Sequence, residues 1–189
     1  MKHIFYHLTA VMVVVVWGMT FISTKVLIVH GLSAQEIFLF RFLLAYAAVC
    51  PISFHRFFAR NLKDELYLVG GGVLGGSLFF FLQNIALGLT QASNVSFIIC
   101  MAPLLTAVLT VLSVRTEKVS RGFIYGSIIA LLGVGLLIFN GSFILRISPL
   151  GDLLTLLASL SWAFYSLVIR SLTRKYSPAF ITRKYFSMA

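Results

Sequence analysis

Acidic side chains are scarce in this sequence. Its 189 residues include five Asp and Glu against fifteen Lys and Arg, which gives a formal net charge of +10. Charged residues make up only 11% of the chain and hydrophobic residues 60%, whereas soluble domains are typically about 25% charged and about 45–50% apolar. The composition excludes an ordinary soluble domain and predicts a membrane protein.

Cysteine is equally rare: only Cys50 and Cys100 occur, and both lie within apolar segments. Neither has CxxC spacing or a nearby His, so we expect no disulfide and no metal site. The apolar segments also lack a cluster of His, Asp or Glu and a Ser/His/Asp arrangement, which a membrane-embedded enzyme would need. The sequence therefore predicts no enzymatic activity and no cofactor.

Long apolar segments, in contrast, follow one another along nearly the whole chain. A helix rises about 1.5 Å per residue, so about 20 apolar residues cross a hydrocarbon core of about 30 Å. The sequence accordingly predicts an all-α membrane protein, a polytopic helical bundle with short connections. Its expected spans are residues 8–29, 34–54, 66–89, 92–114, 123–139 and 151–172.

The basic residues are concentrated in alternate connections between these segments. They are Lys2; Arg56, Arg60 and Lys63; Arg115, Lys118 and Arg121; and Arg170, Arg174, Lys175, Arg183 and Lys184. The other connections contribute only Arg146. Because cytoplasmic loops carry an excess of Lys and Arg, this alternation predicts a cytoplasmic N-terminus. It also argues against nucleic-acid binding, which needs basic residues gathered on one soluble face.

The first apolar segment has a weak copy in the sixth. Aligned on their tryptophans, Trp17 falls on Trp162 and Lys25 on Arg170. Five spans separate the starts of the two copies, and an odd number turns the second copy upside down relative to the first. Such inverted repeats are typical of secondary transporters.

Arg41 is the most informative charge, since it lies about two turns inside the second span. A charge in hydrocarbon is costly unless it faces the bundle or water. Arg41 could contact a substrate, or it could be a structural residue paired with Glu36 or with backbone carbonyls. Lys25 lies about one turn from the end of its span, so we expect its long side chain to reach the membrane surface.

Other candidates lie in spans three to six. Gly71 with Gly75 and Gly72 with Gly76 form pairs of small residues that favour helix packing over a phosphate-binding loop. Pro103 removes the donor for the Ile99 carbonyl, which predicts a kink satisfied by a neighbouring helix or open to a cavity. The tryptophans and Tyr165 lie too deep for the interfacial belt, so we expect packing or pocket-wall roles. The complete set of substrate-path candidates is Trp17, Arg41, Gln83, Asn84, Pro103, Trp162 and Tyr165.

Short motifs occur in a definite order along the chain. They are Trp17-Gly18 with Phe21; Phe38 with Arg41; Asn84-x-Ala86-Leu87, then Ala92-Ser93 and Pro103; Glu117-Lys118-Val119-Ser120 before Gly126 and Gly133-Val134-Gly135; and Gly151-Asp152-Leu153-Leu154 with Trp162-Ala163 and Tyr165. In order and spacing they resemble the EamA branch of the drug/metabolite transporter superfamily. The chain departs from that pattern at Thr116, where a Gly usually precedes the glutamate.

The resemblance implies two inverted five-helix repeats around a central cavity. Residues 1–140 would form the first repeat, and residues 150–189 the start of the second, with its first helix and a stub of the next. We therefore expect a fragment or a truncated gene product, or else a short protein completed by a second chain. In a fragment, the side of span six that carries Trp162 and Tyr165 would face lipid or another copy.

The function implied by the resemblance is that of the N-terminal portion of a secondary transporter. Such a protein exports or moves small metabolites or drugs across the bacterial cytoplasmic (inner) membrane. The alternative is a non-transporting membrane subunit, or a truncated gene product without activity of its own. The expected partners are a small-molecule substrate, the lipid bilayer, and the missing C-terminal half or a second copy of the chain.

Overall fold

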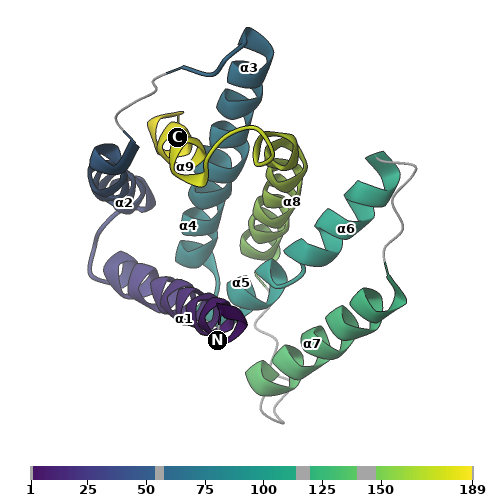
Figure 1. Ribbon diagram of the computed structural model, residues 1–189. Coiled ribbons are helices and arrows are strands. Elements are labelled where there is room, and N and C mark those ends of the chain that lie inside the picture. Colours follow the sequence, from purple (N-terminus) through teal and green to yellow (C-terminus); the bar gives the residue numbers. More distant parts are fainter. Residues whose placement is uncertain (1, 54–57, 114–119, 140–147, 189) are drawn as a thin grey trace.

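The computed structural model describes residues 2–53, 58–113, 120–139 and 148–188, and every regular element in these ranges is helical. The elements are α1 (Lys2–Val29), α2 (Ala34–Val49), η1 (Cys50–Ser53), α3 (Leu62–Gly71), η2 (Gly72–Leu78), α4 (Phe79–Leu89), α5 (Ala92–Ile99), α6 (Ala102–Ser113), α7 (Arg121–Phe139), α8 (Pro149–Leu172) and α9 (Pro178–Met188). They form the bundle in Figure 1. The predicted all-α class is confirmed.

Among the described residues, four helical segments are long and apolar enough to cross a membrane: Ile4–Val29, Leu62–Leu89, Ala92–Ser113 and Pro149–Leu172. On α1 the valines from Val13 to Val16 are between 55% and 63% exposed, which suits a surface in contact with hydrocarbon. The chain is therefore a multi-pass membrane protein.

The second expected span is shorter than the sequence predicts. Helix α2 has 16 residues and gives way at Cys50 to the 3-10 turn η1, which contains Pro51. Proline has no N–H to donate to the carbonyl four residues earlier, so the regular α-helical ladder ends there. Two of the six expected spans, which correspond to α2 and α7, are not among the four membrane-length segments found in the described residues.

A tight turn joins α1 to α2 and makes the two helices diverge. Gly31 has a φ of +98°, and its N–H and that of Leu32 donate to the carbonyls of Ile28 and Leu27. Only glycine adopts this backbone at little cost, and it ends α1 in a Schellman motif. Ser33 and Glu36 then begin α2 with a capping box, in which each side chain accepts from the other's backbone N–H.

Helix α8 lies in the middle of the bundle, between the α3–η2–α4 segment on one side and α5 and α6 on the other (Figure 1). It runs antiparallel to α4: Gly151 lies beside Thr90 at one end, and Trp162 packs on Phe79 further along. The main hydrophobic core forms at this contact and includes Phe79, Ala86, Leu87 and Ala158. Burial against α8 is therefore what organises the neighbouring helices.

Two irregular backbone segments flank α8, and a serine of α8 reaches each of them. Segment η2 is a π-helix, and the Ser161 hydroxyl donates to its Leu74 carbonyl at 2.7 Å. The helix is also interrupted between α5 and α6, where the Ser159 hydroxyl donates to the Ile98 carbonyl at 3.3 Å. Residues two apart on a helix point to nearly opposite sides, so one short stretch of α8 serves both interruptions.

The remaining helices lie at the edges of the bundle. Helix α9 packs against α2, α3 and η2, with Phe180 and Ile181 in a second hydrophobic cluster beside Leu68 and Leu172. Helix α7 lies at the opposite edge and contacts α5 and α6 (Figure 1). The molecule thus has a closely packed half around α4, α8 and α9, and a looser half around α7.

Candidate functional site

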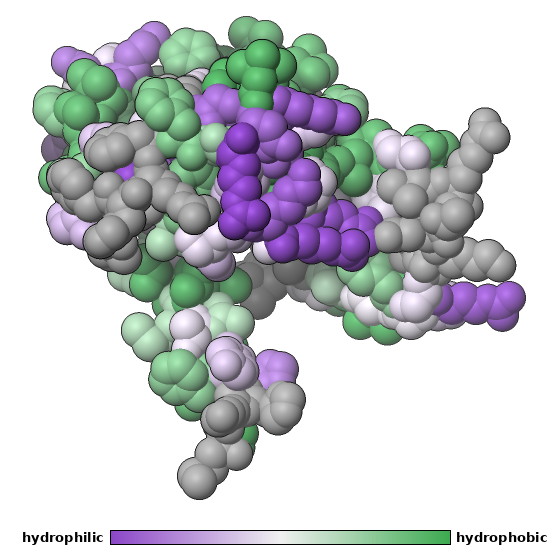
Figure 2. All heavy atoms as spheres, turned by 45° about the horizontal axis from the view of Figure 1, so that its top comes forward, coloured by the Kyte–Doolittle hydropathy of each residue, from purple (hydrophilic) through white to green (hydrophobic). Residues whose placement is uncertain are grey.

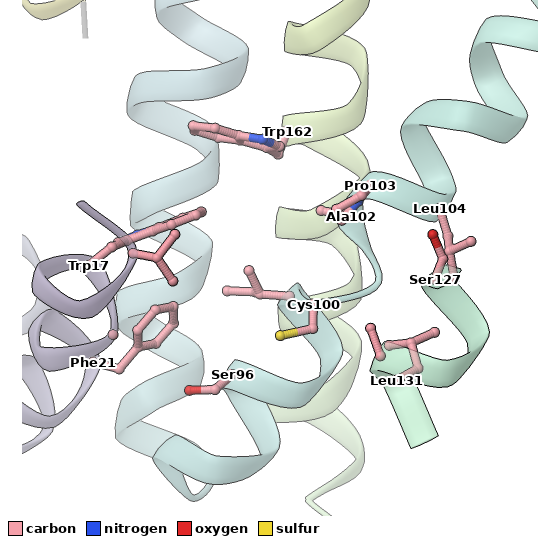
Figure 3. Close-up of a pocket in the computed structure, with 14 residues that line it drawn as sticks. Trp17, Phe21, Ser96, Cys100, Ala102, Pro103, Leu104, Ser127, Leu131 and Trp162 are labelled. Atoms are coloured by element: carbon pink, nitrogen blue, oxygen red, sulfur yellow. The ribbon is translucent and has the colours of Figure 1, made fainter. Parts of the chain in front are cut away.

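A pocket of about 440 Å³ opens between α1, the α5–α6 segment, α7 and α8 (Figure 3). Its wall consists of Val14, Trp17, Gly18, Phe21, Ser96, Ile99, Cys100, Ala102, Pro103, Leu104, Ser127, Ala130, Leu131 and Trp162. Trp17 and Trp162 lie close to the middle of α1 and α8, and Ala130 close to the middle of α7. Since each helix contributes its middle, the pocket lies at mid-depth in the bundle.

The interruption between α5 and α6 forms one wall of the pocket. Helix α5 ends at Ile99 and α6 begins at Ala102, with Pro103 in its first turn. Pro103 has no N–H for the Ile99 carbonyl, so the regular hydrogen-bond ladder cannot continue through this point. The N–H of Met101 turns back to the Ile98 carbonyl at 3.0 Å, and Ser159 of α8 supplies that carbonyl with a second donor.

Aromatic rings line the side of the pocket between α1 and α8. The rings of Trp17 and Trp162 have centroids 5.8 Å apart at an angle of 35°, and Trp162 also contacts Phe79 at 4.8 Å and Tyr165 at 5.1 Å. Tyr165 does not line the pocket but lies behind Trp162, where it also meets Tyr185. The expectation that this side of α8 would face lipid or another copy is wrong, because α1, α4 and α9 cover it.

The pocket wall carries no charged side chain among its described residues. Its polar groups are the hydroxyls of Ser96 and Ser127, the Cys100 thiol and the indoles. The Ser96 hydroxyl is already engaged, since it donates to the Ala92 carbonyl at 2.7 Å. Within the described ranges no group of three or more His, Cys, Asp or Glu could hold a metal ion. Such a wall suits an apolar or aromatic molecule with few polar groups.

Arg41 lies away from the pocket, between α2, α1 and α4. Its guanidinium donates to the Thr24 hydroxyl at 3.4 Å and lies 5.2 Å from the centroid of the Phe80 ring. Glu36, the partner considered from the sequence, accepts hydrogen bonds from Ser33 instead. The arginine is thus half-buried against the bundle, where a cation–π contact offsets part of its lost hydration.

The two amides of α4 also lie outside the pocket, fully shielded from solvent. The Asn84 side chain donates to the Ala34 carbonyl of α2 at 3.3 Å. Both polar atoms of the Gln83 amide lack a partner among the described residues. A buried amide left in this state costs about 1–3 kcal/mol. Asn84 therefore joins two helices, whereas the unpaired Gln83 amide destabilises the folded core.

Lys25 binds the end of a neighbouring helix. Its ammonium donates to the carbonyls of Leu87 at 2.5 Å and Thr90 at 2.9 Å, at the C-terminal end of α4. The Thr90 hydroxyl in turn donates to Asp152 of α8 at 3.4 Å. Helix C-terminal carbonyls lack partners and attract cations. The position of Lys25 near the end of its span predicted only a reach toward the membrane surface. Its partners on α4 could not be read from the local sequence.

A group of charged side chains ties together the other end of the bundle. Lys175 pairs with Asp64 at 2.9 Å, and the Tyr176 hydroxyl donates to the same carboxylate at 2.9 Å. Lys184 of α9 pairs with Glu65 of α3. The hydrogen bond to Asp64 raises the pKa of Lys175, which keeps its ammonium protonated. Figure 2 shows hydrophilic side chains gathered over this end of the molecule.

Sequence reasoning treated these bases only as cytoplasmic anchors. The available signal was the pair of acids at 64–65, the only adjacent acids in the sequence, together with basic pairs at 174–175 and 183–184. The same region fixes the connection before α3, because the backbone N–H of Ala59 donates to Glu65 and that of Arg60 to Tyr176.

Gly71 of α3 and Gly75 of η2 lie against α8, as small residues do at close helix contacts. A methyl group added at Gly75 would lie 2.5 Å from the Tyr165 ring, and one at Gly71 would lie 3.7 Å from Tyr165 and from Ile169. Gly72 and Gly76 are also buried. Gly75 thus leaves the space that Tyr165 occupies behind Trp162.

The comparisons with known proteins agree with this architecture. The model of the EamA-like transporter family matches residues 4–139. Neither the comparison with curated proteins nor that with solved structures gives a match. The family match runs from the first turns of α1 to the end of α7 and includes α1, α5, α6 and α7 of the pocket wall. The chain belongs to the EamA-like transporter family.

Proposed function

We propose that this chain works as a secondary transporter, or as the substrate-binding part of one, which moves small metabolites or drugs across the bacterial cytoplasmic membrane. The observation that carries the proposal is the pocket at mid-depth in membrane-length helices, with the α5–α6 interruption in its wall. Transporters commonly bind substrates near the bilayer midplane beside discontinuous helices.

The chemistry of the wall supports binding of the apolar or aromatic part of a small molecule. Trp17 and Trp162 offer ring faces, and the uncharged wall imposes no opposite charge that a substrate must match. Ser127 and Cys100 supply polar groups on the opposite side (Figure 3). A neutral aromatic compound would lose less hydration here than a compact ion.

Gly18 provides a test of the pocket. It lies in the wall, and a Cβ at this position meets nothing within 4 Å, so the side chain of Gly18→Leu would extend into the pocket. We expect this variant to insert normally and to lose transport. Flux should fall about tenfold or more, the effect of losing about 1.4 kcal/mol of binding free energy.

The measurement is uptake of a panel of radiolabelled amino acids and hydrophobic drugs into proteoliposomes. Gly88→Leu is the matched control, because Gly88 is exposed on α4, outside the pocket wall, and its Cβ position is also open. Parental flux through Gly18→Leu would contradict the proposed site. A parent chain that moves no compound of the panel would favour the non-transporting subunit instead.

A further inference from the structure

Basic side chains outnumber acidic ones at the end of the bundle where α3 begins and α8 ends. Residues 58–66 and 170–184, which meet there, contain seven Lys and Arg against two acids, Asp64 and Glu65. Figure 2 shows hydrophilic side chains gathered over this end of the molecule, with hydrophobic side chains directly beside them. The excess of positive charge is therefore concentrated at this end of the bundle.

Both acids at this end are occupied by groups of the protein itself. The Asp64 carboxylate accepts from Lys175 on one oxygen and from the Tyr176 hydroxyl on the other, each at 2.9 Å. The Glu65 carboxylate accepts from Lys184 on one oxygen and from a backbone N–H on the other. All four carboxylate oxygens thus have a partner, and only two of the seven bases are used to neutralise the two acids.

Three further bases, Arg60, Lys63 and Arg174, form what we call the basic cluster. All three are exposed, and their side chains have no hydrogen-bond or ion-pair partner in the part of the chain that the structure describes. The backbone that carries them is nevertheless fixed. The Arg60 N–H donates to the Tyr176 hydroxyl at 2.9 Å, and Lys63 and Arg174 each come directly before a member of the first ion pair described above. Three cations that the protein does not neutralise are thus held at one end, where they attract an anion.

The basic cluster lies where a membrane-length helical segment begins. Lys63 is the second residue of the segment Leu62–Leu89, which is long and apolar enough to cross the hydrocarbon core. On the first turns of this segment Leu62 and Leu66 are 78% and 63% exposed, and Phe58 just before it is 77% exposed. An exposed apolar surface that continues directly from a group of cations fits a molecule with an anionic head and acyl chains. Phosphate outside a lipid would use the cations alone.

We propose that this end of the molecule binds an anionic phospholipid, with the basic cluster at the phosphate of its head group and the exposed apolar side chains at the start of α3 against its acyl chains. This lipid site goes beyond the proposed transport and does not rest on it. Lipid binding is measured without any substrate, so failure of the lipid site and failure of transport are distinguishable.

The experiment uses the full chain purified in a neutral detergent. Native mass spectrometry with added phosphatidylglycerol gives the dissociation constant of an anionic lipid, and phosphatidylcholine, which has no net charge, gives that of the acyl chains with a neutral head. Inorganic phosphate in large excess serves as a competitor, with the ionic strength matched by chloride because salt screens exposed charges. We expect phosphatidylglycerol to bind about tenfold more tightly than phosphatidylcholine, the effect of about 1.4 kcal/mol, and inorganic phosphate not to displace it.

Neutralising the basic cluster should weaken the binding of phosphatidylglycerol in steps. A base near an anionic lipid contributes about fivefold in affinity, which corresponds to about 1 kcal/mol. Lys63→Gln should therefore bind this lipid about fivefold more weakly, and the triple variant Arg60→Gln/Lys63→Gln/Arg174→Gln about 100-fold more weakly. The affinity for phosphatidylcholine should stay at the parental value in both variants.

Arg121→Gln is the matched control, because it removes the same charge from an exposed position on α7, which packs against α5 and α6 at the opposite edge of the bundle. This variant should bind phosphatidylglycerol as tightly as the parent. If circular dichroism shows that the triple variant does not fold, the three single substitutions make the same comparison. Parental affinity in the folded variants of the cluster, equal weakening in Arg121→Gln, equal affinity for the two lipids, or displacement of the lipid by inorganic phosphate would overturn the proposal.

Discussion

Lys25, Arg41 and Gln83 are polar residues within apolar helices, and in the described structure only the first two find partners that compensate for lost hydration. Lys25 donates to the open carbonyls at the end of α4. Arg41 lies over the Phe80 ring and reaches Thr24. Gln83 has no partner among the described residues. Residue type and depth identified all three as unusual, but their partners belong to other helices and could not be read from local sequence.

Gly75→Ala tests a close contact between η2 and α8. The added methyl group would lie 2.5 Å from the Tyr165 ring, so either Tyr165 or the η2 backbone must move. We expect the free energy of unfolding to fall by about 1–3 kcal/mol. Thermal unfolding in detergent measures this change. Gly70→Ala is the control, because its Cβ position is open, and equal melting temperatures for the two variants would contradict the expected clash.

At the scale of whole elements, α8 links the two irregular segments of the fold. Ser161 reaches the Leu74 carbonyl on the η2 side, and Ser159 reaches the Ile98 carbonyl on the other side. Pro103 predicted the second interruption from the sequence. The π-helix was not predicted, because its glycines were expected only to allow close packing and glycine alone does not specify which turn widens.

Ser161→Ala should destabilise η2 against α8. The substitution removes the 2.7 Å hydrogen bond to the Leu74 carbonyl, which keeps the Phe79 N–H as a donor. The expected loss is therefore that of one hydrogen bond, about 0.5–1.5 kcal/mol. Unfolding in mixtures of mild detergent and dodecyl sulfate measures this loss. Ser166→Ala is the control, since its hydroxyl donates only to the Trp162 carbonyl of its own helix in the described structure. Similar stability losses in both variants would argue against a specific role for Ser161.

At the scale of the whole molecule, composition and hydropathy were enough to predict the all-α membrane class, and the order of the motifs was enough to predict the family. The pocket was only partly foreseeable. Trp17, Pro103 and Trp162 line it, whereas Arg41, Gln83 and Asn84 lie elsewhere. The faces of an apolar helix differ little in composition. The position of a residue along its span therefore indicates that it lies within the membrane, but not which residues meet across a cavity.

The positive-inside pattern predicts the orientation of the molecule. Reporter fusions at Lys63 and Arg121 should read cytoplasmic, and fusions at Gly31 and at position 142, which is outside the described residues, should read external. Alkaline phosphatase and fluorescent-protein fusions give opposite signals on the two sides and check each other. Inverted signals at two of these positions would refute the cytoplasmic N-terminus.

The central position of α8 has a consequence for biosynthesis. A ribosome makes α8 only after α1 to α7, so the face of α4 that carries Phe79 and Ala86 emerges before its packing partner exists. The glycine-lined surface of η2 and the interrupted end of α5 likewise wait for Tyr165 and Ser159. Early helices held in this state favour transient pairings with lipid, the insertion machinery or one another. Arrival of α8 is therefore the event that turns a string of inserted helices into a bundle.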